Sequence, residues 1–322
     1  MKPALVGLAT ALTFGLAAGG TKAAEWPQDV VTIVVPYAPG NITDIAARLI
    51  AQKLTETTEA SVVVENRAGA STQIGTHYVA RSAGDGRTLL LTGAIFATNP
   101  ALFPDIQYDS TTDLKPVALV VSNPLVLVTA PSTPFQEFED LAVHASANPG
   151  EVTVASGGSG TLSHMALALL AESAELDLLH IPYSGGGAAA IDTLGGHVDA
   201  MWDNPSSAIP RIQEGALRGL AVSGLERNAA LPDVPTVHEL GIEGFEVVNW
   251  FGLFAPGTTE PTLLDAIHSS VQSVIQDPAF IERFAREGVT AGQATRAEFT
   301  SFVASETEKW GTIIRENDIS PD

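Results

Sequence analysis

Four turns rich in glycine, serine and threonine are the residues of this chain best suited to hold a ligand. Each follows a predicted strand and opens a predicted helix, at residues 37–44, 68–73, 156–161 and 183–188. The first N–H groups of a helix have no partner within it, and the helix dipole adds a partial positive charge there. Such a turn can bind an anion without any basic side chain.

Twenty residues in and near these turns are candidate ligand-binding residues. For any single turn, a role as a helix cap alone is the favoured explanation, and Asp44 would then simply stabilise the first turn of its helix. Four such turns together favour a ligand site, because α/β sheets bind ligands at the carboxyl ends of their strands. The candidates are Tyr37, Ala38, Gly40, Asn41, Thr43, Asp44, Ala70, Ser71, Thr72, Gln73, Gly157, Ser159, His164, Tyr183, Gly185, Gly186, Gly187, Ala188, Trp202 and Asp203.

We predict that mainly backbone N–H groups bind the ligand, because no Lys or Arg lies within residues 40–43, 70–73 or 185–188. We therefore expect replacement of Arg48 or Arg67 by Gln to weaken binding little. A β-branched residue at Gly186 or Gly187 is expected to distort its turn, because glycine permits backbone angles that other residues resist.

The first and fourth turns repeat one plan, a strand followed by Pro-Tyr, a glycine turn and a helix start. Pro36-Tyr37 begins the first copy, and Pro182-Tyr183 begins the second. This repeat suggests one site element in each of two similar domains, although strand–glycine turns are common enough for a chance match. Tyr37, Tyr183 and Trp202 are placed to wall a pocket or simply to pack.

Signatures of catalysis, metal binding and cofactor binding are weak or missing. Residues 185–190 fit the dinucleotide pattern G-x-G-x-x-A, but a run of glycine and alanine satisfies it trivially. Ser159 lacks the second glycine of a G-x-S-x-G elbow. The seven histidines show no zinc-site spacing, and the chain has no cysteine. We expect no catalytic residue, no metal and no cofactor, and hence not an enzyme.

The composition indicates an exported protein that avoids nucleic acid. A net charge of −21 repels phosphate backbones. Lys2, the apolar run at residues 4–18 and the small residues up to Ala23 have the layout of a cleaved signal peptide. We predict a signal at residues 1–23 and a monomeric mature protein, free in the periplasm because it has no cysteine for a lipid anchor.

Short β-branched segments alternate with helical ones, which predicts an α/β fold with mostly parallel sheets. Asn123-Pro124 separates two extended runs, and residues near Leu125 and Trp250 are the expected crossings between two domains. We assign residues 24–125 plus 249–322 to the first domain and residues 126–248 to the second. The predicted strands are 30–35, 61–64, 88–91, 117–121, 125–129, 152–155, 178–181, 198–202 and 217–222; the predicted helices are 42–54, 135–147, 162–172, 188–194 and most of 261–317.

An ordered series of short motifs resembles the substrate-binding proteins of tripartite tricarboxylate transporters, the Bug or TctC type. The resemblance runs over essentially the whole chain after the signal. No single motif is diagnostic, but the order is highly specific. The motifs are residues 34–40 with Asp44 and Arg48, 64–70, 85–86, 149–150, 157–164, 180–187, 195–199, 231–236 with Glu239 and Gly241, then Trp250, Ala255-Pro256 and Glu306.

The resemblance implies a two-domain periplasmic-binding-protein fold, type II-like, with a ligand cleft between hinged domains. It implies a small carboxylate ligand, such as a di- or tricarboxylate, an acidic amino acid or an aromatic acid. It also implies a grip by backbone amides and ordered water, and delivery to membrane permease subunits. The alternative is a ligand sensor of the same fold that signals to a two-component histidine kinase.

Three departures from the family pattern fall in the candidate site. Asn41 replaces the second glycine of the first turn, and Ser71-Thr72 replace a Gly-Gly pair in the second. These changes are expected to add polar side chains beside the cleft and to suit a more polar ligand. Trp202 stands where phenylalanine is common, which would change the length or width of the pocket.

Overall fold

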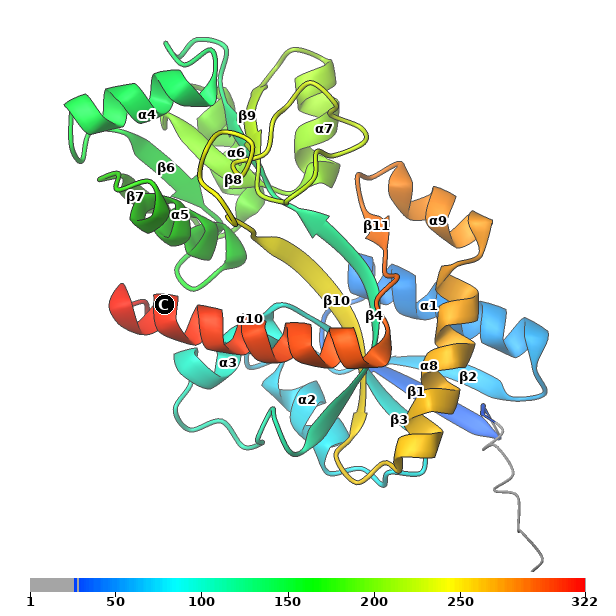
Figure 1. The fold of residues 1–322 in the computed structure, drawn as a ribbon. Coiled ribbons are helices and arrows are strands. Elements are labelled where there is room, and N and C mark those ends of the chain that lie inside the picture. Colours follow the sequence, from blue (N-terminus) through cyan, green and yellow to red (C-terminus); the bar gives the residue numbers. More distant parts are fainter. Residues whose placement is uncertain (1–25, 28, 322) are drawn as a thin grey trace, which may run out of the picture.

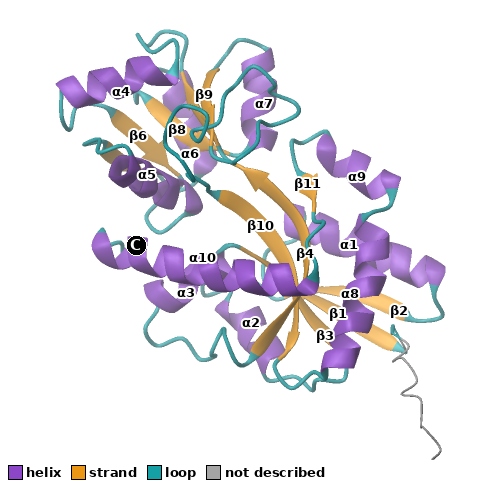
Figure 2. Ribbon diagram, in the orientation of Figure 1, coloured by secondary structure: helices purple, strands orange, loops and turns teal. Residues whose placement is uncertain are grey.

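The computed structural model describes residues 26–27 and 29–321. The predicted signal peptide lies outside these residues. The described chain forms two β-sheets, each flanked by helices, and two long strands connect them (Figures 1 and 2). This is the two-domain α/β architecture expected from the sequence.

The first sheet has the strand order β11-β4-β10-β3-β1-β2. Strand β1, which lies between β3 and the edge strand β2, is buried on both faces, with Val31, Ile33 and Val34 fully inaccessible, as its continuous β-branched sequence requires. The strands are β1 (Val30–Val35), β2 (Ser61–Asn66), β3 (Thr88–Gly93), β4 (Leu114–Pro124), β10 (Val248–Pro256) and β11 (Thr290–Ala291).

The second sheet has the order β7-β6-β8-β5-β9. Its strands are β5 (Val126–Thr129), β6 (Thr153–Ser156), β7 (Leu179–Pro182), β8 (Ala200–Asp203) and β9 (Arg218–Val222). Parallel pairing joins β1 to β2 and β3, and β6 to β7 and β8, whereas β10 and β5 pair antiparallel with their neighbours. The expectation of mostly parallel sheets therefore holds for only part of each sheet, because the connecting strands run in opposite directions.

Helices cover both sheets (Figure 1). Around the first sheet lie α1 (Ile42–Thr57), α2 (Gln73–Ala80), α3 (Ile95–Leu102), α8 (Pro261–Ile275), α9 (Pro278–Ala285) and α10 (Arg296–Glu316). Around the second lie α4 (Phe138–Ala147), α5 (Leu162–Ser173), α6 (Gly186–Leu194) and α7 (Pro205–Gln213). Helix α4 begins three residues later than predicted, because Glu137 and Asp140 form a capping box there.

The short helices α3 and α7 were not predicted, and α2 was expected only as a helix start after the turn at residues 68–73. Helices α3 and α7 contain an internal proline, at Pro100 and Pro210, and α2 is only 8 residues long. Their apolar residues do not repeat over enough turns to give a clear helical period. Tertiary packing therefore decides their conformation.

Strands β4 and β10 form the connection between the two sheets. They pair antiparallel from Val248 opposite Pro124 to Pro256 opposite Leu114. Leu125 is the single residue between β4 and β5. Because the two connecting strands lie side by side, a rotation of one sheet relative to the other would bend both strands at the same level.

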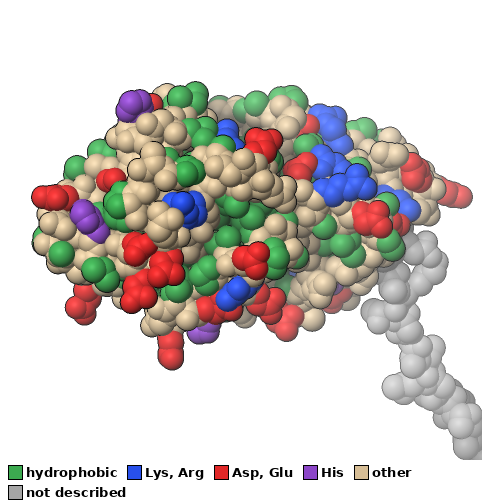
Figure 3. Space-filling model, turned by 90° about the horizontal axis from the view of Figure 1, so that it is seen from above, with side chains coloured by type: hydrophobic (Ala, Val, Ile, Leu, Met, Phe, Trp, Pro, Cys, Tyr) green, Lys and Arg blue, Asp and Glu red, His purple; other side chains and the backbone are tan. Residues whose placement is uncertain are grey.

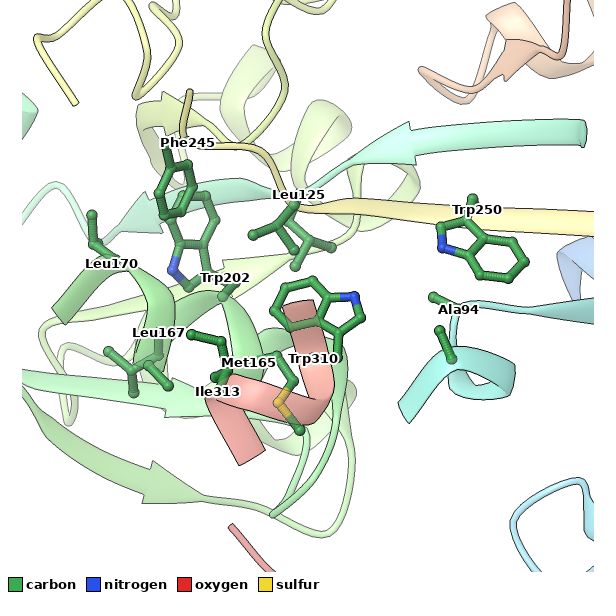
Figure 4. Packing of buried hydrophobic residues seen from close by; sticks show 14 of the residues in the cluster. Ala94, Leu125, Met165, Leu167, Leu170, Trp202, Phe245, Trp250, Trp310 and Ile313 are labelled. Carbon is green, nitrogen blue, oxygen red and sulfur yellow. The ribbon is translucent and has the colours of Figure 1, made fainter. Parts of the chain in front are cut away.

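Helix α10 of the first domain also packs toward the second domain. Figure 4 shows Trp310 and Ile313 of α10 near Met165 of α5, within an apolar cluster that spans both domains. Glu306 is buried, and its carboxylate accepts hydrogen bonds from the indole N–H groups of Trp250 (3.1 Å) and Trp310 (2.8 Å). This network fixes α10 against the connecting strand β10.

Acidic side chains are spread over the face seen in Figure 3, in keeping with the net charge of −21. In the described part of the chain, no helix combines the length and the apolar character needed to cross a bilayer. The same residues contain no cluster of acidic and histidine side chains suited to a metal ion.

Candidate functional site

Two adjoining cavities lie where the domains meet the connecting strands. The smaller cavity has a volume of about 200 Å³ and the larger about 560 Å³. Both are lined by Asn204 and Asn249, so the two cavities adjoin at these residues, and we refer to them together as the cleft. The smaller is also lined by Leu125, Gly157, Thr161, Leu162, Ser163, Gly186, Trp202 and Asp203, and the larger by Gly40, Ile42, Ile45, Asn123, Ser206, Glu287 and Val289.

The amino-terminal ends of α5 and α6 both reach the smaller cavity. The backbone N–H groups of Leu162 and Ser163 in α5, and of Gly186 and Gly187 in α6, donate to no described residue. A Cβ atom at Gly157 would lie 3.2 Å from the nitrogen of Gly186, so glycine at 157 allows the two turns to approach closely. Two helix dipoles and several unpaired N–H groups thus converge on one small space, which is a suitable environment for an anion.

The glycines of the fourth turn differ in what their backbones require. Gly185 has a φ of +153° and is the N-cap residue of α6, whereas Gly186 and Gly187 do not have positive φ values. A Cβ atom at any of the three would meet nothing within 4 Å. The expected reason for glycine at 186 and 187 is therefore wrong: Gly185 carries the unusual backbone angle, and a side chain at Gly186 would enter the cavity without distorting the turn.

The first turn is occupied by its own side chains. The buried carboxylate of Asp44 accepts hydrogen bonds from the N–H of Gly40 (2.9 Å), from Nε of Arg48 (2.9 Å) and from Nδ2 of Asn66 (3.0 Å). Burial alone would raise the pKa of Asp44, but the hydrogen bonds from Arg48, Gly40 and Asn66 outweigh it and hold that pKa below its usual value. Asp44 therefore stabilises the turn from inside.

Asn41 was expected to present a polar side chain to the cleft, but its Oδ1 accepts the N–H of Asp44 (2.9 Å) and caps α1. Thr43 is buried and Ala38 is exposed, and neither lines the two cavities. The hydroxyl of Tyr37 lies 3.4 Å from that of Thr92 and accepts the N–H of Gly93 (3.1 Å). Gly40 is thus the only candidate of the first turn that lines either described cavity.

The second turn has an unusual backbone. Ala70, Ser71 and Thr72 are consecutive residues with positive φ values of 46°, 50° and 72°. Nδ2 of the buried Asn99 donates to the carbonyl of Ser71 (2.8 Å) and to the hydroxyl of Thr72 (3.3 Å). Neither these residues nor Gln73, which opens α2, line the two cavities, so the structure does not place Ser71 and Thr72 as pocket residues.

In the third turn, Gly157 lines the smaller cavity, while Ser159 and His164 line neither cavity. Nδ1 of His164 accepts the N–H of Gly160 (3.2 Å), and its ring stacks on that of His180 with 3.8 Å between centroids. His164 therefore supports the turn. Two candidates of the fourth turn also lie outside both cavities. The hydroxyl of Tyr183 donates a hydrogen bond to Asp192 (2.7 Å), and Ala188 is exposed.

Trp202 and Asp203 line the smaller cavity. Trp202 stacks on Phe245 with 6.0 Å between centroids, as Figure 4 shows. Asp203 is 5% exposed and accepts hydrogen bonds from the N–H of Asn204 (2.8 Å) and the hydroxyl of Ser207 (2.5 Å), with Arg211 at 3.4 Å. Burial raises the pKa of Asp203 despite these partners.

Three asparagines of the cleft were missed by the sequence analysis. Asn123 is the second-to-last residue of β4, Asn204 is the N-cap residue of α7 and Asn249 lies on β10. Asn123 lies near the end of a strand, Asn204 directly follows one, and both precede a proline, so this repeated Asn-Pro pair was an available signal. Asn249 carries no comparable local signal, since only its pairing with Asn123 brings it to the cleft.

Basic side chains are absent from the lining of both cavities in the described residues. The acidic lining residues are Asp203 and Glu287, which pair with Arg211 (3.4 Å) and Arg283 (2.6 Å). Arg48 and Arg67 lie outside both cavities, where Arg67 pairs with Glu65 (2.8 Å). An anion in this cleft would therefore contact backbone N–H groups and neutral side chains.

Comparison with known proteins gives a consistent result over nearly the whole chain. Residues 46–319 match the family described as tripartite tricarboxylate transporter family receptor. The chain is 37% identical over 315 residues to Protein BugT of Bordetella pertussis, covering 97% of this chain and 96% of that protein. It is also 37% identical over 317 residues to a UPF0065 protein from the tcbD-tcbE intergenic region of Pseudomonas sp., covering 97% and 93%.

Solved structures of similar proteins share the fold. The periplasmic binding protein BugD is 34% identical with a TM-score of 0.72, covering 91% of this chain and 99% of that chain. Rpa4515 of R. palustris with adipate is 28% identical with a TM-score of 0.76, covering 92% and 100%. MatC of Rhodopseudomonas palustris with bound malate is 30% identical with a TM-score of 0.71, covering 90% and 100%.

Proposed function

This chain belongs to the family of tripartite tricarboxylate transporter receptors, and we propose that it captures a small carboxylate in the cleft between its two domains. The family consists of periplasmic solute-binding proteins, and the present fold agrees with solved members such as BugD.

The observation that carries the proposal is the convergence of α5 and α6 on the smaller cavity. Unpaired N–H groups of Ser163 and Gly186 reach a space of about 200 Å³ that Trp202 and Leu125 close on the apolar side. A carboxylate there would accept several N–H bonds, and hydrogen bonds to a charged acceptor are roughly twice as strong as neutral ones.

The ligands of two relatives support a carboxylate of modest size. Rpa4515 was solved with adipate and MatC with malate, and both ligands are dicarboxylates. A cavity of about 200 Å³ beside one of about 560 Å³ can accept molecules of this class. We propose a di- or tricarboxylate, an acidic amino acid or an aromatic acid as the ligand class.

We further propose that the domains, residues 24–125 plus 249–322 and residues 126–248, close on the ligand by bending near Leu125 and Trp250, where the chain crosses between them. Contacts already cross between them beside the cleft, since Nδ2 of Asn228 donates to the carbonyl of Gly288 (3.1 Å). A ligand that touches both domains has higher affinity for the closed state and so shifts the population toward it. Small-angle scattering should show compaction on binding.

The proposed role is delivery of the carboxylate to membrane permease subunits by an exported, monomeric periplasmic protein. The motif order, the family and the predicted signal at residues 1–23 support this role. Amino-terminal sequencing of the exported protein should begin near Ala24. Retention of Met1 in the exported fraction would contradict export with cleavage.

A thermal-shift screen of dicarboxylates, tricarboxylates, acidic amino acids and aromatic acids tests the function directly. A ligand at 100 times its dissociation constant should stabilise the folded state by roughly 2.7 kcal/mol. The matching amides should stabilise the protein less than the acids. If no acid raises the melting temperature at millimolar concentration, or if the amides bind as well as the acids, the proposed function is wrong.

A further inference from the structure

Three asparagine side chains meet where the two cavities join. Asn123 and Asn249 pair across β4 and β10, and Asn204 caps α7. Oδ1 of Asn204 lies 3.5 Å from Nδ2 of Asn123 and 3.4 Å from Nδ2 of Asn249. These distances are long for hydrogen bonds, so the hydrogen bonds among the three amides are weak. We refer to these three residues as the asparagine cluster.

The asparagine cluster has hydrogen-bonding capacity to spare. Each primary amide carries two N–H donors and one carbonyl oxygen. The two contacts above use one N–H of Asn123, one of Asn249 and the carbonyl of Asn204, and no other described residue bonds to these side-chain amides. Asn123 is 3% exposed yet lines the larger cavity, so its remaining surface faces the cleft. The cluster can therefore both donate to and accept from a bound molecule.

The charges near the cluster do not suit a carboxylate at this position. No described Lys or Arg lines either cavity, and Asp203 and Glu287 are the charged lining residues. The unpaired helix N–H groups lie instead at Ser163 and Gly186 in the smaller cavity. A small neutral or cationic group that donates hydrogen bonds suits the asparagine cluster better than a second anion.

We propose that the ligand carries a hydroxyl or amino group on the carbon chain beside its carboxylate, and that the asparagine cluster recognises this group. The inference rests on the proposed function, since it assumes a carboxylate at the ends of α5 and α6. Asn204 and Asn249 line both cavities, which places them next along the cleft from that carboxylate. A hydroxyl donates and accepts, as the cluster does, whereas a methylene would leave the amides unpaired when closure excludes water.

Matched acids test this inference by isothermal titration calorimetry. The first series is succinate, malate and aspartate; the second is glutarate, 2-hydroxyglutarate and glutamate; the third is butyrate and 2-hydroxybutyrate. A site built to bond a hydroxyl discriminates strongly against the analogue without it. Within the series that binds most tightly, we expect the hydroxy or amino acid to bind at least about 10-fold more tightly than the unsubstituted acid.

Two variants assign the discrimination to the cluster. Asn249→Leu and Asn204→Leu each replace the amide by an apolar side chain of similar size. Asn148→Leu, at the end of α4 and away from the cleft, is the control. For each of the first two, the substituted acid should lose about 10-fold in affinity and the unsubstituted acid less than about 3-fold. Asn249→Leu keeps the test decisive if Asn204→Leu does not fold.

Two results would overturn the inference. One is binding of the unsubstituted acid within about 3-fold of its hydroxy and amino analogues; the other is an equal loss of both acids in Asn249→Leu. In either case an unsubstituted acid still binds, so the proposed function stands. If no acid of these series binds while a tricarboxylate or an aromatic acid of the thermal-shift screen does, the inference fails and the proposed function stands. If no acid of the screen binds, both fail.

Discussion

The first and fourth turns share a sequence plan but differ in how their N–H groups are used. In the first turn the N–H of Gly40 donates to Asp44, and the N–H of Asp44 donates to the cap residue Asn41. In the fourth turn the N–H groups of Gly186 and Gly187 have no described partner, and Gly186 lines the smaller cavity. One turn is satisfied internally, and the other is open to a ligand.

The difference shows that a glycine turn at a helix start is not by itself an anion site. Asp44 places a carboxylate at the positive end of α1, while no acidic residue lies in the first turn of α6. The carboxylate of Asp44 thus largely offsets the positive end of the α1 dipole, whereas no side chain in the first turn of α6 offsets that of α6. We therefore assign a stabilising role to the first turn and ligand binding to the fourth.

The largest expected effect comes from a charge placed in the fourth turn. Gly186→Asp should lower the affinity for a carboxylate by about 100-fold or more, because like charges a few ångströms apart repel by several kcal/mol. The fold should be retained, since an acidic residue suits a helix amino terminus. Calorimetry on the tightest acid of the screen measures the loss.

Ile191→Asp is the matched control, because it places the same charge on the exposed face of α6, where Ile191 is 68% exposed. It should change the affinity by less than about 3-fold, since exposed charges beyond about 8 Å are screened at physiological salt. Equal losses in the two variants would show that the α6 terminus does not contact the ligand.

Stability should separate two neighbouring glycines of the fourth turn. Gly185→Ala should lower the free energy of unfolding by about 1–3 kcal/mol, because its φ of +153° lies in a region that other residues rarely adopt. Gly186→Ala should change it by less than about 1 kcal/mol, because Gly186 has an ordinary φ and open space. Urea denaturation measures both, and the reverse order of effects would contradict the backbone geometry described here.

Asp44→Asn should affect the first turn mainly through stability. Loss of the charged acceptor for Gly40, Arg48 and Asn66 should lower the free energy of unfolding by about 1–3 kcal/mol at neutral pH, with the affinity changed less than about 5-fold. The exposed pair Asp265–Arg296 provides a control, since Asp265→Asn should cost no more than about 1 kcal/mol.

The Asp44 effect should depend on pH in a defined direction. Its pKa is lower in the folded protein than in the unfolded chain, so its contribution is present above its ordinary pKa and is lost as pH falls through the folded value. The stabilities of wild type and Asp44→Asn should therefore converge in acid. A difference that stays constant down to about pH 2 would refute this assignment.

The smallest expected effect is proton uptake on binding. Burial raises the pKa of Asp203, and an anionic ligand in the same cavity should raise it further. The complex then holds more protons than the free protein, so the affinity for an acid without an amino group should rise as the pH falls toward the raised pKa of Asp203. Asp203→Asn should flatten this dependence, and proton release by wild type would show that the carboxylate lies elsewhere.

Local sequence patterns were sufficient to predict part of the fold and part of the candidate site. Strand and helix periodicity predicted β1, α1 and α5, and glycine-rich turns after strands predicted Gly40, Gly157 and Gly186 at the cleft. The sequence could not show which N–H groups stay unpaired, because Asn66 reaches Asp44 from 22 residues away. It also could not place Asn249 beside Asn123, since antiparallel pairing of two distant strands brings them together.

Amide chemical shifts of isotope-labelled protein test the central claim most directly. On saturation with the tightest carboxylate, the N–H protons of Gly186, Gly187 and Ser163 should shift downfield, because they become donors to a charged acceptor. The N–H protons of Gly40 and Asp44 already have partners and should shift little. Large downfield shifts at Gly40 and Asp44, with Gly186 and Gly187 unchanged, would contradict the assignment of ligand binding to the fourth turn.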